Sequence, residues 1–316
     1  MFRRDSALNE QFADWSRRPF YDERKIAPHM RKRAESRRAS GYLRYPAVVH
    51  LETQAVCNAA CSFCPYPTME RKGTRMPDSL IDKVLGDLTA IPPELPFQLA
   101  PYKVSDPLVE ARIFDIMREV NRRLPNAHLS LITNGAALTD ANIARLEAVQ
   151  RLAYLHVSLN FCDAAEYEAV MKIPFERTVR RLDALHEARP RFPVRLTRVS
   201  QDQNSDLAFT RWTAARYPRF ETIIVPRNDW IGEVPGAQAT AVPDVPCHRW
   251  FDLSVTATGV VALCCMDGDA RYPKGDVRTE HALDIYNRPH LLDMRTRLMS
   301  RREAPDPCRR CTYLSF

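Results

Sequence analysis

Three closely spaced cysteines follow the first apolar run of this 316-residue chain and constrain its fold and chemistry more than any other feature. Cys57, Cys61 and Cys64 stand without a fourth cysteine or histidine beside them, and the nearest histidine is His50. An iron–sulfur cubane normally takes four thiolates, so three thiolates leave one iron with an open coordination position. Because catalytic metal sites keep such a position for a small molecule, the triplet predicts a catalytic metal centre.

A structural zinc site is the alternative for these thiols. Such a site takes four ligands, typically as two separated pairs, so a fourth ligand would have to come from a distant segment. A disulfide framework suits small secreted domains, whereas this chain is long and we expect no signal peptide at its start.

Composition bounds the class of protein. Hydrophobic residues make up 45% of the chain and charged residues 27%, which is typical of a soluble globular protein. The sequence has no apolar run of membrane-spanning length, and its nine cysteines suit a reducing compartment. We therefore expect a cytoplasmic protein without a membrane partner.

The net charge of +7 is concentrated in residues 1–45, which hold 12 Lys and Arg against 6 Asp and Glu. A basic arm can bind nucleic acid or another anionic partner. We favour a basic helical extension that packs on the main body through Phe12, Trp15 and Phe20, because no RNA-binding signature accompanies the charge. Nucleic acid is therefore not expected as a partner.

From residue 46 on, short apolar runs alternate with helical patterns, which predicts parallel βα units of an α/β fold. The expected strands cover residues 47–52, 96–100, 128–132, 154–159, 194–199 and 222–225. Helices are expected to start at Asp78, at Asp106 (running on to Leu124), at Thr139 and at Asp163. Six units predict a partial (β/α)6 TIM-like barrel over residues 46–232, with its chemistry in the loops that leave the C-terminal ends of the strands.

The spacing of the triplet, with Phe63 just before its last cysteine, resembles the signature loop of the radical S-adenosylmethionine (radical SAM) superfamily. The resemblance implies a 4Fe–4S cluster on Cys57, Cys61 and Cys64 whose open iron binds the amino and carboxylate groups of SAM. It also implies a six-unit partial barrel and cleavage of SAM to a 5′-deoxyadenosyl radical. Phe63 is expected near the adenine, and flavodoxin or ferredoxin as the reductant.

The resemblance extends over about residues 46–230 and implies further SAM contacts at the strand ends. Residues 103–107 replace the Gly-Gly-Glu-Pro stretch of the family without its glycines, which leaves Ser105 and Asp106 as candidates. Asp106 is equally a candidate helix N-cap. The other candidates are Thr133, Asn134, Gly135, Ser158, Asn160 and Lys172, of which Gly135 permits a positive φ and Lys172 is equally a solvated lysine.

A second cysteine set follows a proline-rich stretch beyond residue 232. Alternating apolar residues predict a β-hairpin that turns at Gly259, and a helix is expected over residues 291–298. The pattern resembles a SPASM domain shortened to the one-cluster twitch form over residues 233–316, which implies an auxiliary 4Fe–4S cluster. Its ligands would be Cys247, either Cys264 or Cys265, Cys308 and Cys311, with Cys264 favoured by its spacing from Gly259. A four-cysteine zinc site is the alternative.

The resemblance also implies hydrogen abstraction from an unreactive C–H bond. We expect dehydrogenation or epimerisation of a sugar or aminocyclitol-like small molecule, anionic sugars included, in a natural-product pathway. Candidate hydrogen donors are Cys162, after the fourth strand, and the unligated member of Cys264 and Cys265; Tyr66 is a further catalytic candidate. The second hypothesis is modification of a ribosomally made peptide, and the third is a non-catalytic zinc protein that binds nucleic acid.

Overall fold

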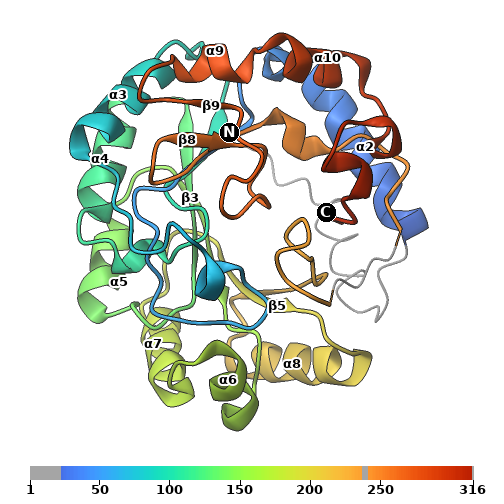
Figure 1. Cartoon of the computed structure of the whole chain (residues 1–316). Helices are drawn as coiled ribbons and strands as arrows, with labels where there is room; N and C mark the ends of the chain where they lie inside the picture. Colours follow the sequence, from blue (N-terminus) through green and yellow to red (C-terminus); the bar gives the residue numbers. More distant parts are fainter. Residues whose placement is uncertain (1–22, 237–240, 315–316) are drawn as a thin grey trace.

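The computed structural model describes residues 23–236 and 241–314 (Figure 1). Its centre is a nine-stranded sheet in the order β6-β5-β4-β3-β2-β1-β7-β8-β9. The strands are β1 (Val48–Leu51), β2 (Phe97–Ala100), β3 (Ala127–Thr133), β4 (Leu152–Ser158), β5 (Val194–Val199), β6 (Glu221–Val225), β7 (Asp252–Val255), β8 (Val260–Ala262) and β9 (Gly275–Asp276). Neighbours from β1 to β6 pair in parallel, so the six predicted strands and the partial barrel are confirmed.

Helices surround the strands in a ring (Figure 1). Those that alternate with the parallel strands are α3 (Asp78–Leu88), α4 (Ile113–Arg123), α5 (Asp140–Glu147), α6 (Ala164–Met171), α7 (Phe175–Glu187) and α8 (Gln203–Arg216). The C-terminal helices α9 (Ala282–Tyr286) and α10 (Pro289–Arg297) and the N-terminal helix α2 (Glu23–Arg38) lie on the other side of the ring. The apolar stripes of the barrel helices and of α9 share one large core with the strands, in which Leu85, Leu155 and Leu182 are fully or almost fully buried.

Most helix starts follow the predicted capping chemistry. α3 begins at Asp78, as expected. The Thr139 side chain accepts a hydrogen bond from the Asn142 amide, and the Asp163 side chain accepts one from the Glu166 amide at 2.9 Å. These acceptors satisfy amide groups that have no partner inside the first turn of a helix.

The single helix predicted from Asp106 to Leu124 is wrong in its first part. Asp106 caps only a short 3-10 turn, Pro107–Val109, and α4 begins at Ile113. The backbone of Glu110 is extended, and its carboxylate binds the amide and guanidinium of Arg112 at 2.8–3.1 Å. This local ion pair interrupts the helical hydrogen bonding that the apolar spacing alone suggested.

The C-terminal segment continues the sheet of the barrel. β7 pairs in parallel with β1, so that Val48 lies opposite Asp252 and Leu51 opposite Val255. β8 returns antiparallel to β7 through a turn in which Gly259 has φ +89°, which confirms the predicted hairpin. The sheet therefore crosses the predicted boundary between residues 46–232 and 233–316, and those domain limits stay a prediction.

α2 confirms a helix within the predicted basic extension, although the proposed anchors Phe12, Trp15 and Phe20 lie outside the described residues. Its buried residues recur every four positions, as on one face of a helix: Ile26 and Met30 pack with Val245 and Leu314, and Ala34 packs beside Trp250. Helix α2 thus packs against the C-terminal segment, near α10 (Figure 1).

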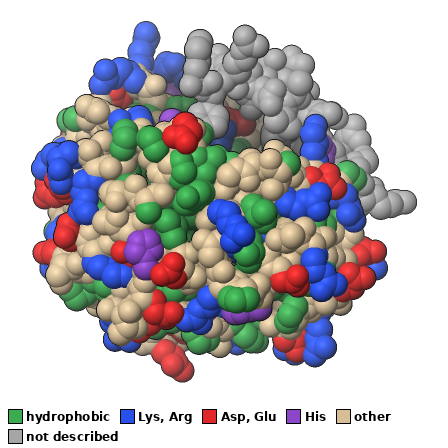
Figure 2. Space-filling view, turned by 90° about the horizontal axis from the view of Figure 1, so that it is seen from above, with side chains coloured by type: hydrophobic (Ala, Val, Ile, Leu, Met, Phe, Trp, Pro, Cys, Tyr) green, Lys and Arg blue, Asp and Glu red, His purple; other side chains and the backbone are tan. Residues whose placement is uncertain are grey.

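The surface carries charges of both signs. On the face shown in Figure 2, Lys and Arg side chains lie among Asp and Glu rather than in one continuous basic area. Within the described ranges, no helix is both long enough and apolar enough to cross a bilayer.

The shared sheet predicts that barrel and C-terminal segment unfold together. Leu253 of β7 is 2% exposed and belongs to the same core as the barrel strands. Leu253→Ala should lower the free energy of unfolding by about 2–5 kcal/mol in a single transition. Leu207→Ala, at a half-buried position of α8, should cost less than half as much. Equal losses in anaerobic urea titrations, or two separate transitions, would contradict this packing.

Candidate active site

A cavity of about 980 Å³ lies inside the barrel. Alternate residues of the strands line it, such as Tyr154, His156 and Ser158 of β4, because side chains alternate between the two faces of a sheet. The predicted site residues that line it are Cys57, Cys61, Phe63, Cys64, Tyr66, Ser105, Asp106, Thr133, Asn134, Ser158 and Cys265. Its volume falls in the range of about 300–1,000 Å³ that is typical of small-molecule sites.

The triplet is held by the loop that leaves β1. The Ala59 amide points to Cys57 Sγ at 3.4 Å, and the Cys64 amide closes a turn on the Cys61 carbonyl at 3.1 Å. Burial raises the pKa of the Cys57 thiol to about 11 and that of Cys64 to about 12, and it raises the pKa of Cys61 as well. Cys57 and Cys64 are both electrostatic neighbours of Cys61, so three buried thiolates would be costly by themselves, and bonds to the irons of a shared cluster would compensate their charge.

The thiols have the donor chemistry that iron–sulfur clusters take. Three thiolates can hold a cubane with one open iron, and four thiolates can hold a fully ligated cubane. The loop after β1 supplies three cysteines, and the C-terminal segment supplies Cys247, Cys264, Cys308 and Cys311. Both cysteine sets therefore fit 4Fe–4S clusters.

Asp106 ties the loop after β2 to the end of β3. The Thr133 hydroxyl donates to its carboxylate at 2.9 and 3.0 Å, and the amides of Asn134 and Leu108 donate at 2.8 and 3.0 Å. Burial raises the pKa of Asp106, while these donors act in the opposite direction. The N-cap interpretation is thus confirmed for the short 3-10 turn, and contact with the SAM amino group stays a prediction.

The Thr133-Asn134-Gly135 segment positions the triplet loop. Asn134 Nδ2 donates to Asn58 Oδ1 at 2.6 Å and lies 3.7 Å from Cys57 Sγ. Gly135 has φ +86°, and a Cβ there would lie 2.9 Å from the Val157 side chain. The predicted positive φ at Gly135 is therefore confirmed and leaves little room for any other residue.

Apart from the second cysteine set, four predicted residues lie away from the lining of the cavity. Asn160 is buried, donates to Ser158 Oγ at 2.9 Å and accepts from the Val199 amide at 2.8 Å, so it orients Ser158. Lys172 is exposed and ends α6 in the left-handed conformation at φ 60°. Cys162 is half-buried. Gly135 is the fourth residue outside the lining. Direct roles for them stay predictions.

The second cysteine set gathers beside the cavity. Burial raises the pKa of Cys264, and the thiols that act on it are those of Cys265, Cys311, Cys308 and Cys247. The Trp250 indole donates to Cys308 Sγ at 3.4 Å. These contacts support the four-cysteine ligand set that contains Cys264.

Cys265 has different surroundings from its neighbour. It lines the cavity, and the groups that act on its thiol are Arg249, Asp252 and Lys103, followed by a single thiol of the second set, that of Cys247. The two cysteines lie in the turn after β8, in which the Asp267 amide donates to the Cys264 carbonyl at 3.2 Å, and Cys265 is the one of the two that lines the lumen.

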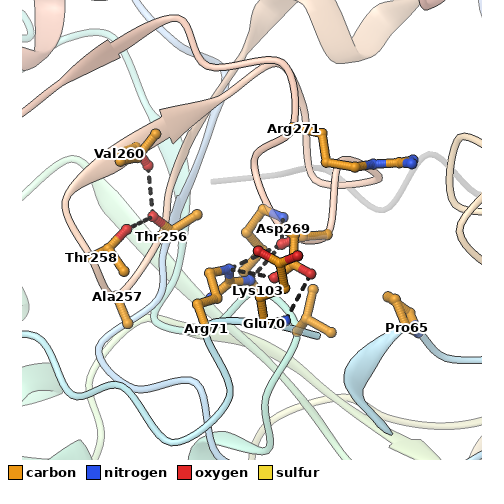
Figure 3. A network of polar contacts seen from close by, with 12 residues as sticks. Pro65, Glu70, Arg71, Lys103, Thr256, Ala257, Thr258, Val260, Asp269 and Arg271 are labelled. Carbon is orange, nitrogen blue, oxygen red and sulfur yellow. Dashed lines mark hydrogen bonds and ion pairs between the residues drawn. The ribbon is translucent and has the colours of Figure 1, made fainter. Parts of the chain in front are cut away.

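A polar network missed by the sequence predictions connects the two cysteine loops (Figure 3). Arg71, after the triplet, donates to the Gly268 carbonyl at 2.6 Å and pairs with Glu52 at the end of β1. Glu52 also accepts from the amides of Val104 and Ala257, each at 3.0 Å. Lys103 donates to Gly268 from the loop after β2 at 3.1 Å. The available signal was Glu52, an acidic residue at the end of a strand whose other residues, except His50, are apolar.

The profile of the radical SAM superfamily matches residues 51–198, and the profile of the SPASM iron–sulfur cluster-binding domain matches residues 247–312. The chain belongs to the radical SAM superfamily. It is a radical SAM enzyme with a C-terminal SPASM domain, and its cofactors are SAM and 4Fe–4S clusters. The zinc interpretation of the two sites is therefore wrong.

Solved structures share the fold at low sequence identity. BtrN in complex with AdoMet and 2-DOIA is 15% identical with a TM-score of 0.59, over 85% of this chain and 94% of that one. Streptococcus suis SuiB bound to precursor peptide SuiA is 10% identical with a TM-score of 0.60, over 84% and 70%. The anSMEcpe enzyme with bound AdoMet is 11% identical with a TM-score of 0.59, over 84% and 85%. No curated protein sequence matches the chain.

Because Cys264 and Cys265 have different surroundings, their alanine variants should differ in iron content. Wild-type protein reconstituted with iron and sulfide should hold about eight irons per chain, two cubanes of four. Cys264→Ala should hold about four, whereas Cys265→Ala should keep about eight. Iron analysis with Mössbauer spectroscopy measures both; loss of four irons from Cys265→Ala alone would reverse the assignment.

Proposed function

We propose that this radical SAM enzyme epimerises a small, sugar-like molecule, with Cys265 as the hydrogen donor. The observation that carries the proposal is the placement of Cys265: it lines the cavity that the cysteine triplet also lines, while Cys264 faces the other thiols. A thiol on one wall and the SAM cluster on another would address opposite faces of a substrate between them, which is the arrangement that inversion at carbon requires.

The chain's own residues supply the second half of the reaction. When bound, SAM and the reduced cluster supply a carbon radical that removes a hydrogen atom from an unreactive C–H bond. The S–H bond of Cys265 then breaks, and its hydrogen atom forms a C–H bond on the opposite face of the substrate carbon. One electron from reduced flavodoxin or ferredoxin and one proton restore the thiol. Burial lowers the pKa of the nearby Lys103, which suits it to give that proton.

The remaining walls can orient the substrate and exclude water. Gln98 donates to Tyr154 and to Ser130, the latter at 2.5 Å, and His156 stacks on Tyr154 at 4.4 Å between ring centroids. Burial lowers the pKa of His156 to about 3, so the ring is neutral and hydrogen-bonds to substrate hydroxyls without adding charge. Hydroxyl-rich sugars or aminocyclitols match such a lining.

Two alternatives use the same cavity and clusters: a different reaction and a different substrate. In a dehydrogenation the substrate radical would give its second electron to an acceptor outside the cavity, and the adjacent auxiliary cluster is such an acceptor. A peptide substrate is the second candidate, because the fold is shared with the peptide-bound structure of SuiB. The volume of the cavity supports the small molecule over the peptide.

A pair of cysteine variants tests the proposal. A panel of sugars, aminocyclitols and their phosphates is incubated with reconstituted enzyme, SAM and dithionite in D2O. Epimerisation through an exchangeable thiol should place one solvent deuterium on the inverted carbon. Cys265→Ala should lose at least 100-fold of this product while 5′-deoxyadenosine still forms, and Cys162→Ala should retain it.

Three results would overturn the assignment. Full epimerisation by Cys265→Ala, or loss of epimerisation in Cys162→Ala, would show that a residue other than Cys265 donates the hydrogen atom. An oxidised product without solvent deuterium would establish dehydrogenation instead.

A further inference from the structure

Trp230 connects the loop after β6 with the triplet loop. Its side chain lines the cavity, and its indole N–H donates to the Phe63 carbonyl at 3.1 Å. The N–H is the single polar group of an indole, so this bond satisfies the hydrogen-bonding capacity of the side chain. Because the Phe63 carbonyl belongs to the peptide group that leads into Cys64, the indole holds the backbone at the last cysteine of the triplet.

Packing fixes the ring of Trp230 as well. It lies against a small buried core on which Cys64 and Tyr66 also pack, and the residues of this core are Ala55, Met69, Val104 and Ala257. These four residues come from the segment after β1, the loop after β2 and the β7–β8 hairpin. A large aromatic ring with one polar and one apolar contact is held in one direction.

The backbone at Trp230 has an uncommon conformation. Trp230, Ile231 and Gly232 are three consecutive left-handed residues, with φ of 51°, 56° and 80°. Residues other than glycine seldom adopt this region and keep it only where their surroundings hold it. Within the turn, the Asp229 carboxylate accepts from the Ile231 amide at 3.1 Å, and the Asp229 carbonyl accepts from the Val234 amide at 2.9 Å.

The segment after the second cysteine set holds this turn from outside. Arg271 donates to the Ile231 carbonyl at 2.7 Å and pairs with Glu233 at 3.2 Å. Glu233 also accepts from the Gly268 amide at 3.1 Å. Gly268 and Arg271 follow Cys265 by only a few residues, so one short turn touches the C-terminal cysteine loop on one side and the triplet loop on the other.

We propose that Trp230 is a positioning residue for SAM binding and that the C-terminal segment holds it in place. The indole keeps the Phe63 carbonyl, and with it the backbone at Cys64, in one position before SAM arrives. A site that is ordered in advance binds more tightly, because binding no longer has to order it. Trp230 acts through Phe63 and Cys64, so the three cysteines remain the expected ligands of the cluster. The inference does not involve Cys265 and is independent of the proposed epimerisation.

The variant Trp230→Phe tests the bond to Phe63, because it removes the N–H donor and keeps an aromatic ring. SAM is titrated by anaerobic isothermal calorimetry into reconstituted protein without dithionite. The dissociation constant of SAM should rise about fivefold over wild type, as expected for the loss of one hydrogen bond between neutral groups.

Two further measurements distinguish positioning from a loss of structure. The iron content of Trp230→Phe should stay at about eight per chain, because every expected cysteine ligand is still present. For the same reason, the EPR spectrum of the reduced variant without SAM should match that of wild type.

The matched control is Trp212→Phe. Trp212 of α8 packs on Phe175 and Tyr217, at 6.3 and 5.8 Å between ring centroids, and is outside the lining of the cavity. The same exchange of indole for phenyl should therefore leave the SAM dissociation constant at the wild-type value.

The variant Arg271→Gln tests the hold of the C-terminal segment on the turn. Its side chain is 44% exposed and outside the cavity lining, so the variant should fold and keep its iron. The dissociation constant of SAM should rise about threefold, because the turn loses an outside contact while the indole stays. Arg278→Gln is the control: Arg278 pairs with Asp276 of β9 in the same segment and should bind SAM like wild type when replaced.

The contrary outcomes are distinct. Wild-type SAM affinity in Trp230→Phe, or an equal loss of affinity in Trp212→Phe, would overturn the positioning role of the indole. If Trp230→Phe does not fold or loses iron, Arg271→Gln decides the question. Wild-type SAM affinity in Arg271→Gln, or an equal loss in Arg278→Gln, would overturn the role of the C-terminal segment.

Discussion

The parallel pairing of β1 and β7 determines where the chemistry of this protein lies. The triplet loop leaves the C-terminal end of β1, and Cys247 precedes the N-terminal end of β7. Because the two strands run side by side in register, the two cysteine sets lie toward opposite ends of one strand pair. The lumen between them is the cavity, lined by Cys57, Cys61 and Cys64 and also by Cys265. The sheet thus fixes the separation of the clusters and the space for a substrate.

The Arg71–Glu52–Lys103 network keeps these parts in place. Glu52 is completely buried, which is costly for a carboxylate unless charged and amide donors surround it. Its donors come from the triplet loop, the loop after β2 and the β7–β8 hairpin, so one carboxylate joins three segments that are far apart in sequence. Arg71 and Lys103 then bind carbonyl groups in the loop that follows Cys265.

Local patterns were enough to predict the strands and the caps at Thr139 and Asp163, because these features depend on neighbours in sequence. The cysteine ligands stay predictions. Asp106 shows the limit of such patterns: its carboxylate binds across to Thr133 and Asn134, and Glu110 with Arg112 delays α4. The contact of α2 with the segment before β7 was also beyond reach, since Arg37 and Arg249 share Asp252 only through tertiary packing. One signal was available in the strands. Strands buried on both faces are usually apolar throughout, so His50, Gln98 and His156 indicated a polar lumen.

The account depends most on two clusters at the ends of the lumen with the Cys265 thiol free between them. Anomalous diffraction at the iron edge, from crystals grown anaerobically with SAM, tests this directly. We predict one four-iron site at Cys57, Cys61 and Cys64 and another at Cys247, Cys264, Cys308 and Cys311, with Cys265 Sγ bound to no metal. A zinc signal at the second site, or Cys265 in place of Cys264 among its ligands, would contradict the account.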